Sequence, residues 1–202
     1  MFITLEGIDG SGKTTQSRHI VKFLESKGCF CVKTQQPGGT KIGEKIREIL
    51  LDPKNSRIDP IAELLLYTAD RVQHINTFII PLLKTGKTVV CDRYFDSTLA
   101  YQGYARGLDI SLIRRLHKAV VNVLKPDLTI LLDLSPETGL ERARKNIETR
   151  FEKESFTFHQ KVREGYLKIA GSEPDRFSII DAGEDESLVF EKIKKAIVPK
   201  LG

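Results

Sequence analysis

The chain has 202 residues, of which 40% are hydrophobic, so it is long enough for one domain with a substantial core. No window approaches the roughly 18–20 apolar residues of a membrane-spanning helix, and the start, MFITLEG, lacks a secretion-signal pattern. The formal net charge of +5 comes without a basic tail or a long block of one sign, so it does not by itself indicate nucleic-acid binding. We therefore expect a single cytoplasmic domain over 1–202 that binds neither membrane nor nucleic acid.

Short apolar runs typical of strands alternate along the chain with amphipathic runs typical of helices. The expected strands are 2–6, 30–34, 88–92, 128–134 and 177–181. The expected helices are 14–27, 42–51, 60 to about 84, 110–124, 136–147, 156–170 and 187–201. This alternation predicts an α/β fold, a five-stranded parallel sheet with helices on both faces. Pro81 should kink or interrupt the long third helix.

Residues 7–14, GIDGSGKT, fit the phosphate-loop pattern G-x-x-x-x-G-K-[ST] between an expected strand and an expected helix. Glycines let backbone N–H groups face phosphate oxygens, and the helix N-terminus adds a positive potential. The lysine would reach the β- and γ-phosphates, and the first threonine would coordinate Mg²⁺. The sequence predicts a nucleoside triphosphate site made by Gly7, Ile8, Asp9, Gly10, Ser11, Gly12, Lys13, Thr14 and Thr15.

A second polar cluster follows the expected strand 88–92. Asp92 and Arg93 lie at the carboxyl end of this strand, the edge at which open parallel sheets bind their ligands. An acid there can hold Mg²⁺ through water, and an adjacent arginine can grip a phosphate. Asp133, at the end of another strand, is a rival for the metal role, and a structural ion pair is the alternative for Asp92 and Arg93.

Tyr67 and Arg71 are four residues apart in an expected helix, so their side chains project from the same face. An aromatic ring beside an arginine suits a nucleotide, whose base stacks on the ring while the cation holds a phosphate. A core tyrosine next to a surface arginine is the alternative.

Together these motifs resemble the thymidylate kinase family. The resemblance rests on the phosphate loop with Asp9, on PGGT at 37–40, on ADR at 69–71 and, most specifically, on DRYFDSTLAYQG at 92–103. It implies a P-loop nucleoside monophosphate kinase fold and the reaction ATP + dTMP → ADP + dTDP, a step of dTTP synthesis. It also implies Mg²⁺ as the cofactor and a homodimer.

The resemblance further implies roles for individual residues. Asp9 would accept a hydrogen bond from the sugar 3′-hydroxyl of dTMP, and Arg93 would hold the acceptor phosphate. Arg71 would hold the thymine end or the phosphate side of the acceptor site. Tyr101 would crowd the sugar 2′ position and disfavour ribonucleotides, and Arg47 would line the same site.

At the base end, Gln102 and either Thr98 or Ser97 would bond the base edge. Two positions depart from the family pattern. Tyr67 stands where the family usually stacks a phenylalanine on thymine, so its added hydroxyl needs water or a polar neighbour. Gln36 precedes PGGT where bacterial members commonly have glutamate, so one carboxylate is missing.

Some thymidylate kinases carry a basic residue inside the phosphate loop, but this chain does not. The charge-dense stretch 141–155 supplies Arg142, Arg144 and Arg150 instead, which resembles the bacterial type with a mobile lid. A closing lid would bring an arginine over ATP and exclude water. We expect Arg150 to be catalytic and Arg142 to bind ATP, where it could stack on adenine. The alternative for the whole stretch is a solvent-exposed helix face with no role in the site.

Three other functions remain open from the sequence. Another P-loop kinase would act on a different nucleoside monophosphate, and a switch protein would hydrolyse ATP or GTP without an acceptor. The chain lacks an N-K-x-D-like guanine-reading motif, which counts against a GTPase. A nucleic-acid binder finds support only in the net charge.

Overall fold

The computed structural model describes residues 1–55, 57–121, 124–143, 149–151 and 153–201. One sheet of five parallel strands has the order β2-β3-β1-β4-β5, which confirms the expected fold class. The strands are β1 (Phe2–Glu6), β2 (Cys31–Gln35), β3 (Thr88–Asp92), β4 (Leu128–Asp133) and β5 (Phe177–Asp181). Because β1 is central and pairs with both β3 and β4, the carboxyl ends of these strands meet at one edge.

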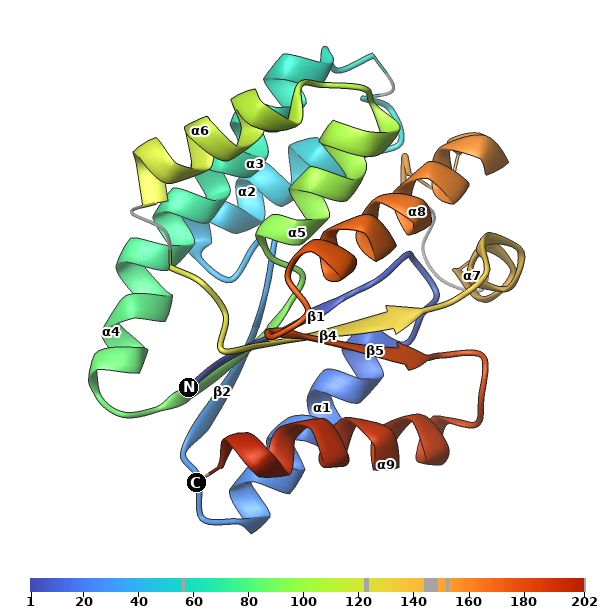
Figure 1. Ribbon diagram of the computed structural model, residues 1–202. Helices are drawn as coiled ribbons and strands as arrows, with labels where there is room; N and C mark the ends of the chain where they lie inside the picture. Colours follow the sequence, from blue (N-terminus) through green and yellow to red (C-terminus); the bar gives the residue numbers. More distant parts are fainter. Residues whose placement is uncertain (56, 122–123, 144–148, 152, 202) are drawn as a thin grey trace.

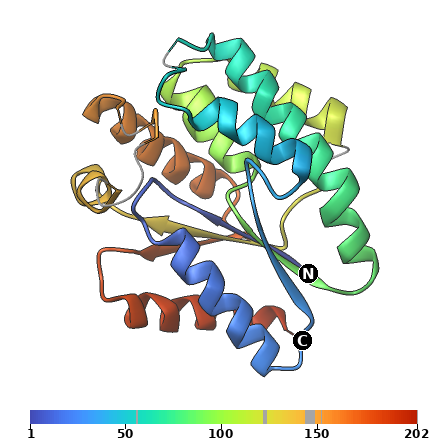
Figure 2. The ribbon, with the colours of Figure 1, turned by 180° about the vertical axis from the view of Figure 1, so that it is seen from behind.

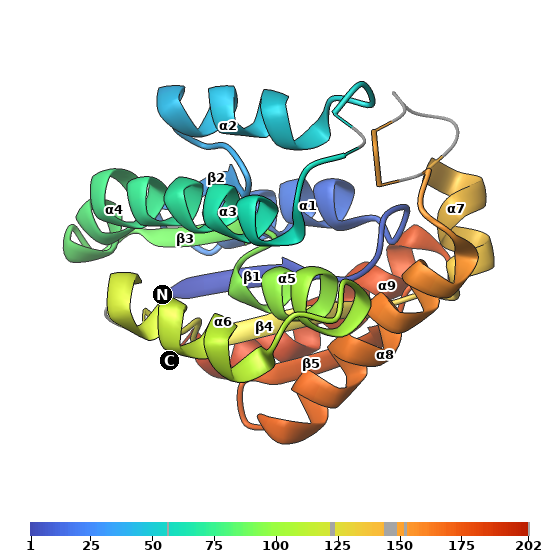
Figure 3. The ribbon, with the colours of Figure 1, turned by 90° about the horizontal axis from the view of Figure 1, so that it is seen from above.

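Helices cover both faces of the sheet. The α-helices are α1 (Lys13–Ser26), α2 (Lys41–Leu51), α3 (Pro60–His74), α4 (Ile80–Lys84), α5 (Phe95–Thr98), α6 (Ile110–Val121), α7 (Pro136–Ala143), α8 (Phe156–Ser172) and α9 (Glu186–Ile197). The π-helical turns are η1 (Ile75–Ile79) and η2 (Leu99–Ala105), and η3 (Val198–Lys200) is a 3₁₀ turn. Helices α1 and α9 lie on one face, and α4, α5, α6 and α8 on the other (Figures 1 and 2). From above, α2 lies at one edge, next to α3 (Figure 3).

The third expected helix is interrupted, as predicted from Pro81. Between α3 and α4 the chain forms the π turn η1, in which the Ile80 N–H bonds to the Ile75 oxygen five residues back. Proline has no N–H for a helical bond and its ring crowds the preceding turn, so the widened turn lets the helix continue towards Pro81.

Residues 95–105 are helical, which the sequence analysis did not predict. They form α5 and η2, and all residues from Leu99 to Gly103 are buried. Five consecutive buried residues hide the 3.6-residue period by which a helix is recognised. Other boundaries shift by a few residues; parts of the expected helices 110–124 and 136–147 lie outside the described residues. Among those described, no helix has the length and apolar character to cross a membrane.

His117 on α6 is a buried polar side chain of the core. It is 8% exposed, and its ring stacks on Phe95 with 3.6 Å between the ring centroids. Burial, and then the positive charge of Arg71, lower the pKa of His117 to about 3. The ring is therefore neutral in the folded protein at neutral pH.

We expect the substitution His117→Phe to weaken the acid dependence of stability. The unfolded histidine gains a proton near pH 6.5 and the folded one does not, so wild-type stability is lost as pH falls from about 6.5 towards 4. His117 should contribute about 1.4 kcal/mol per pH unit to the fall in the free energy of unfolding, and the stacked phenylalanine should contribute nothing. Urea denaturation at pH 7, 5.5 and 4.5 measures both slopes. Equal slopes would contradict a neutral buried His117.

Candidate functional site

The loop between β1 and α1 follows a path that two of its residues permit only because they are glycines. Gly7 and Gly10 have φ angles of 140° and 77°. A Cβ at Gly10 would lie 2.2 Å from the Gly139 oxygen, and one at Gly7 would lie 2.5 Å from the Leu132 oxygen. The loop thus packs against the backbone around β4 and α7, and it ends where α1 begins, at Lys13. Its backbone N–H groups and the helix N-terminus can therefore face an anion.

Lys13 is a buried cation within this loop. Its Nζ donates to the Ile8 oxygen at 2.7 Å and to the Ser11 Oγ at 3.3 Å. Burial, and then the charge of Arg93, lower the pKa of Lys13 to about 8, although nearby carboxylates including Asp9 oppose this. A phosphate beside Lys13 would stabilise the charged form of the buried ammonium and so raise its pKa again.

Thr14 and Asp92 meet across the ends of α1 and β3. The Thr14 hydroxyl donates to Asp92 Oδ2 at 2.7 Å. A hydroxyl and a carboxylate form a hard oxygen donor pair, which is the type that Mg²⁺ prefers. The rival Asp133 instead forms a bidentate ion pair with Arg163, at 2.7 and 2.8 Å. The donor set at Thr14 and Asp92 therefore fits a magnesium ion.

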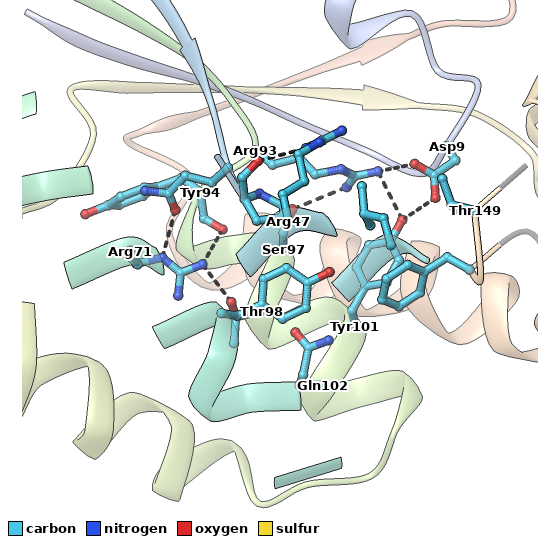
Figure 4. Close-up of a pocket in the computed structure, with 15 residues that line it drawn as sticks. Asp9, Arg47, Arg71, Arg93, Tyr94, Ser97, Thr98, Tyr101, Gln102 and Thr149 are labelled. Carbon is cyan, nitrogen blue, oxygen red and sulfur yellow. Dashed lines mark hydrogen bonds and ion pairs between the residues drawn. The ribbon is translucent and has the colours of Figure 1, made fainter. Parts of the chain in front are cut away.

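Two adjoining pockets lie at this edge of the sheet. The first, the phosphate pocket, is lined by Asp9, Gly10, Gly12, Lys13, Thr14, Thr15, Arg18, Gln35, Gln36, Arg47, Asp92, Arg93, Arg142 and Ala143. The second pocket is lined by Asp9, Gln36, Pro37, Arg47, Leu51, Tyr67, Arg71, Arg93, Tyr94, Ser97, Thr98, Tyr101, Gln102, Thr149 and Phe151 (Figure 4). All residues expected to bind the acceptor line the second pocket. Gly7, Ile8 and Ser11, expected at ATP, are not among the residues that line the phosphate pocket.

Arg93 lies between the two pockets and lines both. Its Nη2 donates to Asp9 Oδ1 at 2.6 Å and to the Tyr101 hydroxyl at 3.1 Å, and its Nη1 donates to the Gly7 oxygen at 2.9 Å and to the Tyr166 hydroxyl at 3.0 Å. Burial opposes a charge on Asp9, but Arg93 and then Lys13 lower the pKa of Asp9 to about 2. Asp9 is therefore an ionised acceptor at neutral pH.

The backbone of Arg93 is strained. Its φ of 68° places it in the left-handed region, which a residue with a Cβ rarely adopts. This turn directs the chain from the end of β3 into α5 and aims the guanidinium back at the phosphate loop. Backbone strain at a charged residue between two pockets is typical of a functional site.

Glu6 is a buried carboxylate that the sequence analysis missed. It accepts hydrogen bonds from the Tyr94 N–H at 2.7 Å, the Ser97 hydroxyl at 2.6 Å and the Tyr166 hydroxyl at 3.0 Å. Burial, and then Asp96, raise the pKa of Glu6 to about 7. Its position at the end of an apolar strand, directly before the loop, was the available signal. Tyr166, on α8, offered none.

Arg71 is buried and fixed by acceptors on two sides. Its Nε donates to Gln36 Oε1 at 3.0 Å, and its Nη2 donates to the Thr98 hydroxyl at 2.8 Å and to the Tyr94 oxygen at 3.2 Å. Burial, and then Arg71, lower the pKa of His74 to about 4, so its unprotonated Nδ1 can accept from Gln36 Nε2 at 3.0 Å. Gln36 thus accepts from the cation Arg71 and donates to the neutral His74. A glutamate carboxylate at this position could accept from Arg71 but could not donate to His74.

Tyr67 and Arg47 also line the second pocket. Arg47 donates from Nη1 to the Pro37 oxygen at 2.8 Å, so it projects from α2 over the loop that follows β2. Among the described residues, no hydrogen-bond partner faces the Tyr67 hydroxyl. Of the two partners expected for the Tyr67 hydroxyl, water or a polar neighbour, the second is not found among the described residues.

The two described arginines of the stretch 141–155 lie in different surroundings. Arg142 lines the phosphate pocket, as expected, and donates to the Ala182 oxygen at 2.9 Å. Arg150 was expected over ATP, but here it is 5% exposed and pairs with the fully buried carboxylate of Glu63. It lines neither pocket, because this buried charge requires a cationic partner. Arg144 lies outside the described residues.

Comparison with known proteins gives consistent matches along the chain. A family model described as thymidylate kinase matches residues 5–193. A thymidylate kinase of Desulforapulum autotrophicum is 52% identical over 210 residues, which cover 100% of this chain and 92% of the relative. One of Desulfosudis oleivorans is 54% identical over 190 residues, covering 90% of this chain and 89% of the relative.

A solved structure is similar as well. The crystal structure of thymidylate kinase from Ehrlichia chaffeensis has a TM-score of 0.80, is 36% identical and covers 98% of both chains. The family model extends over the phosphate loop, both pockets and all of the sheet except the first residues of β1. The chain belongs to the thymidylate kinase family.

Proposed function

We propose that this enzyme transfers the γ-phosphate of ATP to dTMP, giving ADP and dTDP for dTTP synthesis, and that Arg93 and Asp9 join its two substrate sites. The observation that carries the proposal is the pair of adjoining pockets that share Arg93 and Asp9. One pocket contains a phosphate loop, and the other contains arginines and aromatic side chains suited to a nucleotide. Reactants held in adjoining pockets react in an effectively unimolecular step.

The phosphate pocket would hold ATP. Backbone N–H groups of the loop and Lys13 would bind the β- and γ-phosphates. Thr14 and Asp92, 2.7 Å apart, would hold Mg²⁺, which neutralises charge on the phosphates when it is bound. Arg142, which lines this pocket, would contact ATP as well.

The second pocket would hold dTMP. Arg93 would bind the acceptor phosphate, ionised Asp9 would accept from the sugar 3′-hydroxyl, and Tyr101 would exclude a 2′-hydroxyl. The acceptor phosphate is already an anion, so no strong general base is required. Phosphoryl transfer depends mainly on positioning and charge stabilisation, which these residues supply.

The base would lie towards the deeper end of the pocket. Tyr67 would stack on thymine, while Arg71 and Gln102 would bond its edge, supported by Arg47 along the pocket wall. Of the two hydroxyls considered for the base edge, Ser97 already donates to Glu6, whereas Thr98 accepts from Arg71. The hydroxyl hydrogen of Thr98 therefore remains available to donate to the base edge, whereas that of Ser97 does not.

The test of the function is ADP release from ATP and Mg²⁺ with different acceptors. We expect fast release with dTMP, slower release with dUMP, little with dCMP or AMP, and none with thymidine, which has no phosphate for Arg93. Chelating Mg²⁺ should abolish turnover. Equal rates with AMP or dCMP would indicate a different nucleotide kinase. Release without any acceptor would contradict a kinase.

Arg71 and Arg150 should affect different kinetic constants. The lid at about 141–155, with Arg150 as its catalytic residue, remains a prediction, and Arg150 would have to leave Glu63 to stabilise the transferring phosphoryl group. Arg150→Ala should then lower kcat by about 10³-fold with little change in either KM, whereas Arg71→Ala should raise the KM for dTMP alone. Steady-state kinetics with each substrate varied separates these effects. A change confined to the KM for ATP would assign Arg150 to binding.

We also propose a homodimer, supported by exposed apolar side chains on the neighbouring helices α2, α3 and α6. Helix α3 packs against both α2 and α6. Each of the three helices exposes two large apolar side chains: Ile42, Ile49, Ile61, Leu65, Leu112 and Val120. A second copy would bury this face.

A cytoplasmic location also remains a prediction, which the free thiols of Cys29, Cys31 and Cys91 support.

Leu65→Lys should disrupt this dimer. Leu65 is 52% exposed on α3, and Leu188, which is 54% exposed on α9, provides a matched control on the other face of the sheet. Sedimentation should give wild type and Leu188→Lys a mass of twice the 22.8 kDa chain, and Leu65→Lys the mass of one chain. A monomeric wild type would contradict the dimer.

A further inference from the structure

Glu63 is a fully buried carboxylate beside the second pocket, and the proposed function gives it no role. It lies on α3 and has an exposed fraction of 0%. It accepts a hydrogen bond from Gln102 Nε2 at 2.6 Å and ion-pairs with Arg150. Arg106 approaches its two oxygens at 3.4 Å. The carboxylate is thus surrounded by donors from η2 and from the residues before α8.

Glu63 fixes which end of the Gln102 amide faces the pocket. The nitrogen of an amide can only donate and its oxygen can only accept, and a carboxylate accepts. The Gln102 nitrogen must therefore face Glu63, which leaves Oε1 as the end available to a ligand. Gln102 is 1% exposed and lines the second pocket, and no described residue donates to this oxygen.

Arg71 presents the complementary group close by. Its Nε and Nη2 are occupied by Gln36, Thr98 and the Tyr94 oxygen, whereas no described residue accepts from its Nη1. Figure 4 shows Thr98 between Arg71 and Gln102 on one side of the pocket. The pocket therefore offers a donor and an acceptor to one edge of a base.

This pattern matches only some pyrimidines. Thymine and uracil present an N3–H donor next to the O4 acceptor, whereas cytosine presents an N3 acceptor next to an amino donor. With Glu63 holding the amide, cytosine would set its N3 lone pair against Gln102 Oε1 and its amino group against Arg71. Leaving buried polar groups without partners costs binding free energy, so the pocket should discriminate strongly against cytosine nucleotides.

We propose that Glu63 is a specificity-determining positioning residue, which fixes the Gln102 amide and so selects a pyrimidine with an N3–H over cytosine. This inference rests on the proposed function, because it assumes that a nucleoside monophosphate occupies the second pocket. Glu63 acts through Gln102 and does not touch the base.

The substitution Glu63→Gln tests the proposal. The guanidinium groups of Arg106 and, while it remains paired with residue 63, of Arg150 can only donate, so they would bond to the oxygen of the new amide. Its nitrogen would then face Gln102, whose amide would turn and present its own nitrogen to the base. The ratio of kcat/KM for dTMP to that for dCMP should fall about tenfold or more, with dUMP following dTMP and the KM for ATP unchanged.

Arg106→Gln is the matched control. It removes another contact of Glu63 but leaves the carboxylate facing Gln102, so the dTMP to dCMP ratio should stay within about twofold of wild type. If Glu63→Gln alone does not fold, as judged by circular dichroism, the double variant Glu63→Gln/Arg106→Gln is compared with Arg106→Gln. Both members of this pair lack the Arg106 guanidinium, and only the double variant lacks the carboxylate. The change in the dTMP to dCMP ratio between them therefore reports on the carboxylate of Glu63.

The outcomes separate the two proposals. If wild type turns over dTMP and the Glu63→Gln variants lower both kcat/KM values in equal proportion, Glu63 is only structural and this inference is overturned. A ratio that falls as far in Arg106→Gln would overturn it as well. If wild type shows no turnover that depends on dTMP, the proposed function itself is wrong.

Discussion

The bonding of the Arg93 guanidinium is the constraint on which the rest of the site depends. This cation joins the phosphate loop, η2 and α8 through Gly7, Tyr101 and Tyr166, and it pairs with Asp9. A buried guanidinium needs acceptors around it, and a charged one needs an anion. Asp9 meets this need, and the ion pair in turn holds Asp9 ionised between the pockets. The position of each pocket is thereby tied to the other.

Buried carboxylates perform the same task at two further places. Glu6 accepts from the first residues after β3 and from Tyr166, which sets where α5 begins. Glu63, on α3, does so on the other side of the second pocket, where it accepts from η2 and from the segment before α8. An oxygen that accepts a hydrogen bond fixes the direction of the donor opposite it. The pocket therefore receives a defined pattern of donors and acceptors, without which it could not distinguish one base edge from another.

Local patterns in the sequence predicted the strands and the phosphate loop, and the resemblance to the thymidylate kinase family predicted the acceptor residues. These features depend on neighbouring residues, such as the glycines and lysine of 7–14 or the run 92–103. What the sequence could not show were pairings between distant positions. Glu63 and Arg150 are 87 residues apart, and Glu6 and Tyr166 are 160 apart. Each of these residues taken alone resembles an ordinary residue, and only the fold, which brings Arg150 to α3 and α8 to the end of β1, gives it a partner. The helix at 95–105 was missed because its buried residues run consecutively.

The missing carboxylate at Gln36 has an electrostatic consequence for the second pocket. Its described lining contains three arginines, Arg47, Arg71 and Arg93, but only one carboxylate, that of Asp9. A glutamate at position 36, which lines both pockets, would offset a further positive charge there. The neutral amide of Gln36 accepts a hydrogen bond from Arg71 Nε without adding a negative charge, and it donates a hydrogen bond to neutral His74. The pocket keeps a positive potential towards an anionic phosphate, while each buried polar group in this chain of contacts retains a partner.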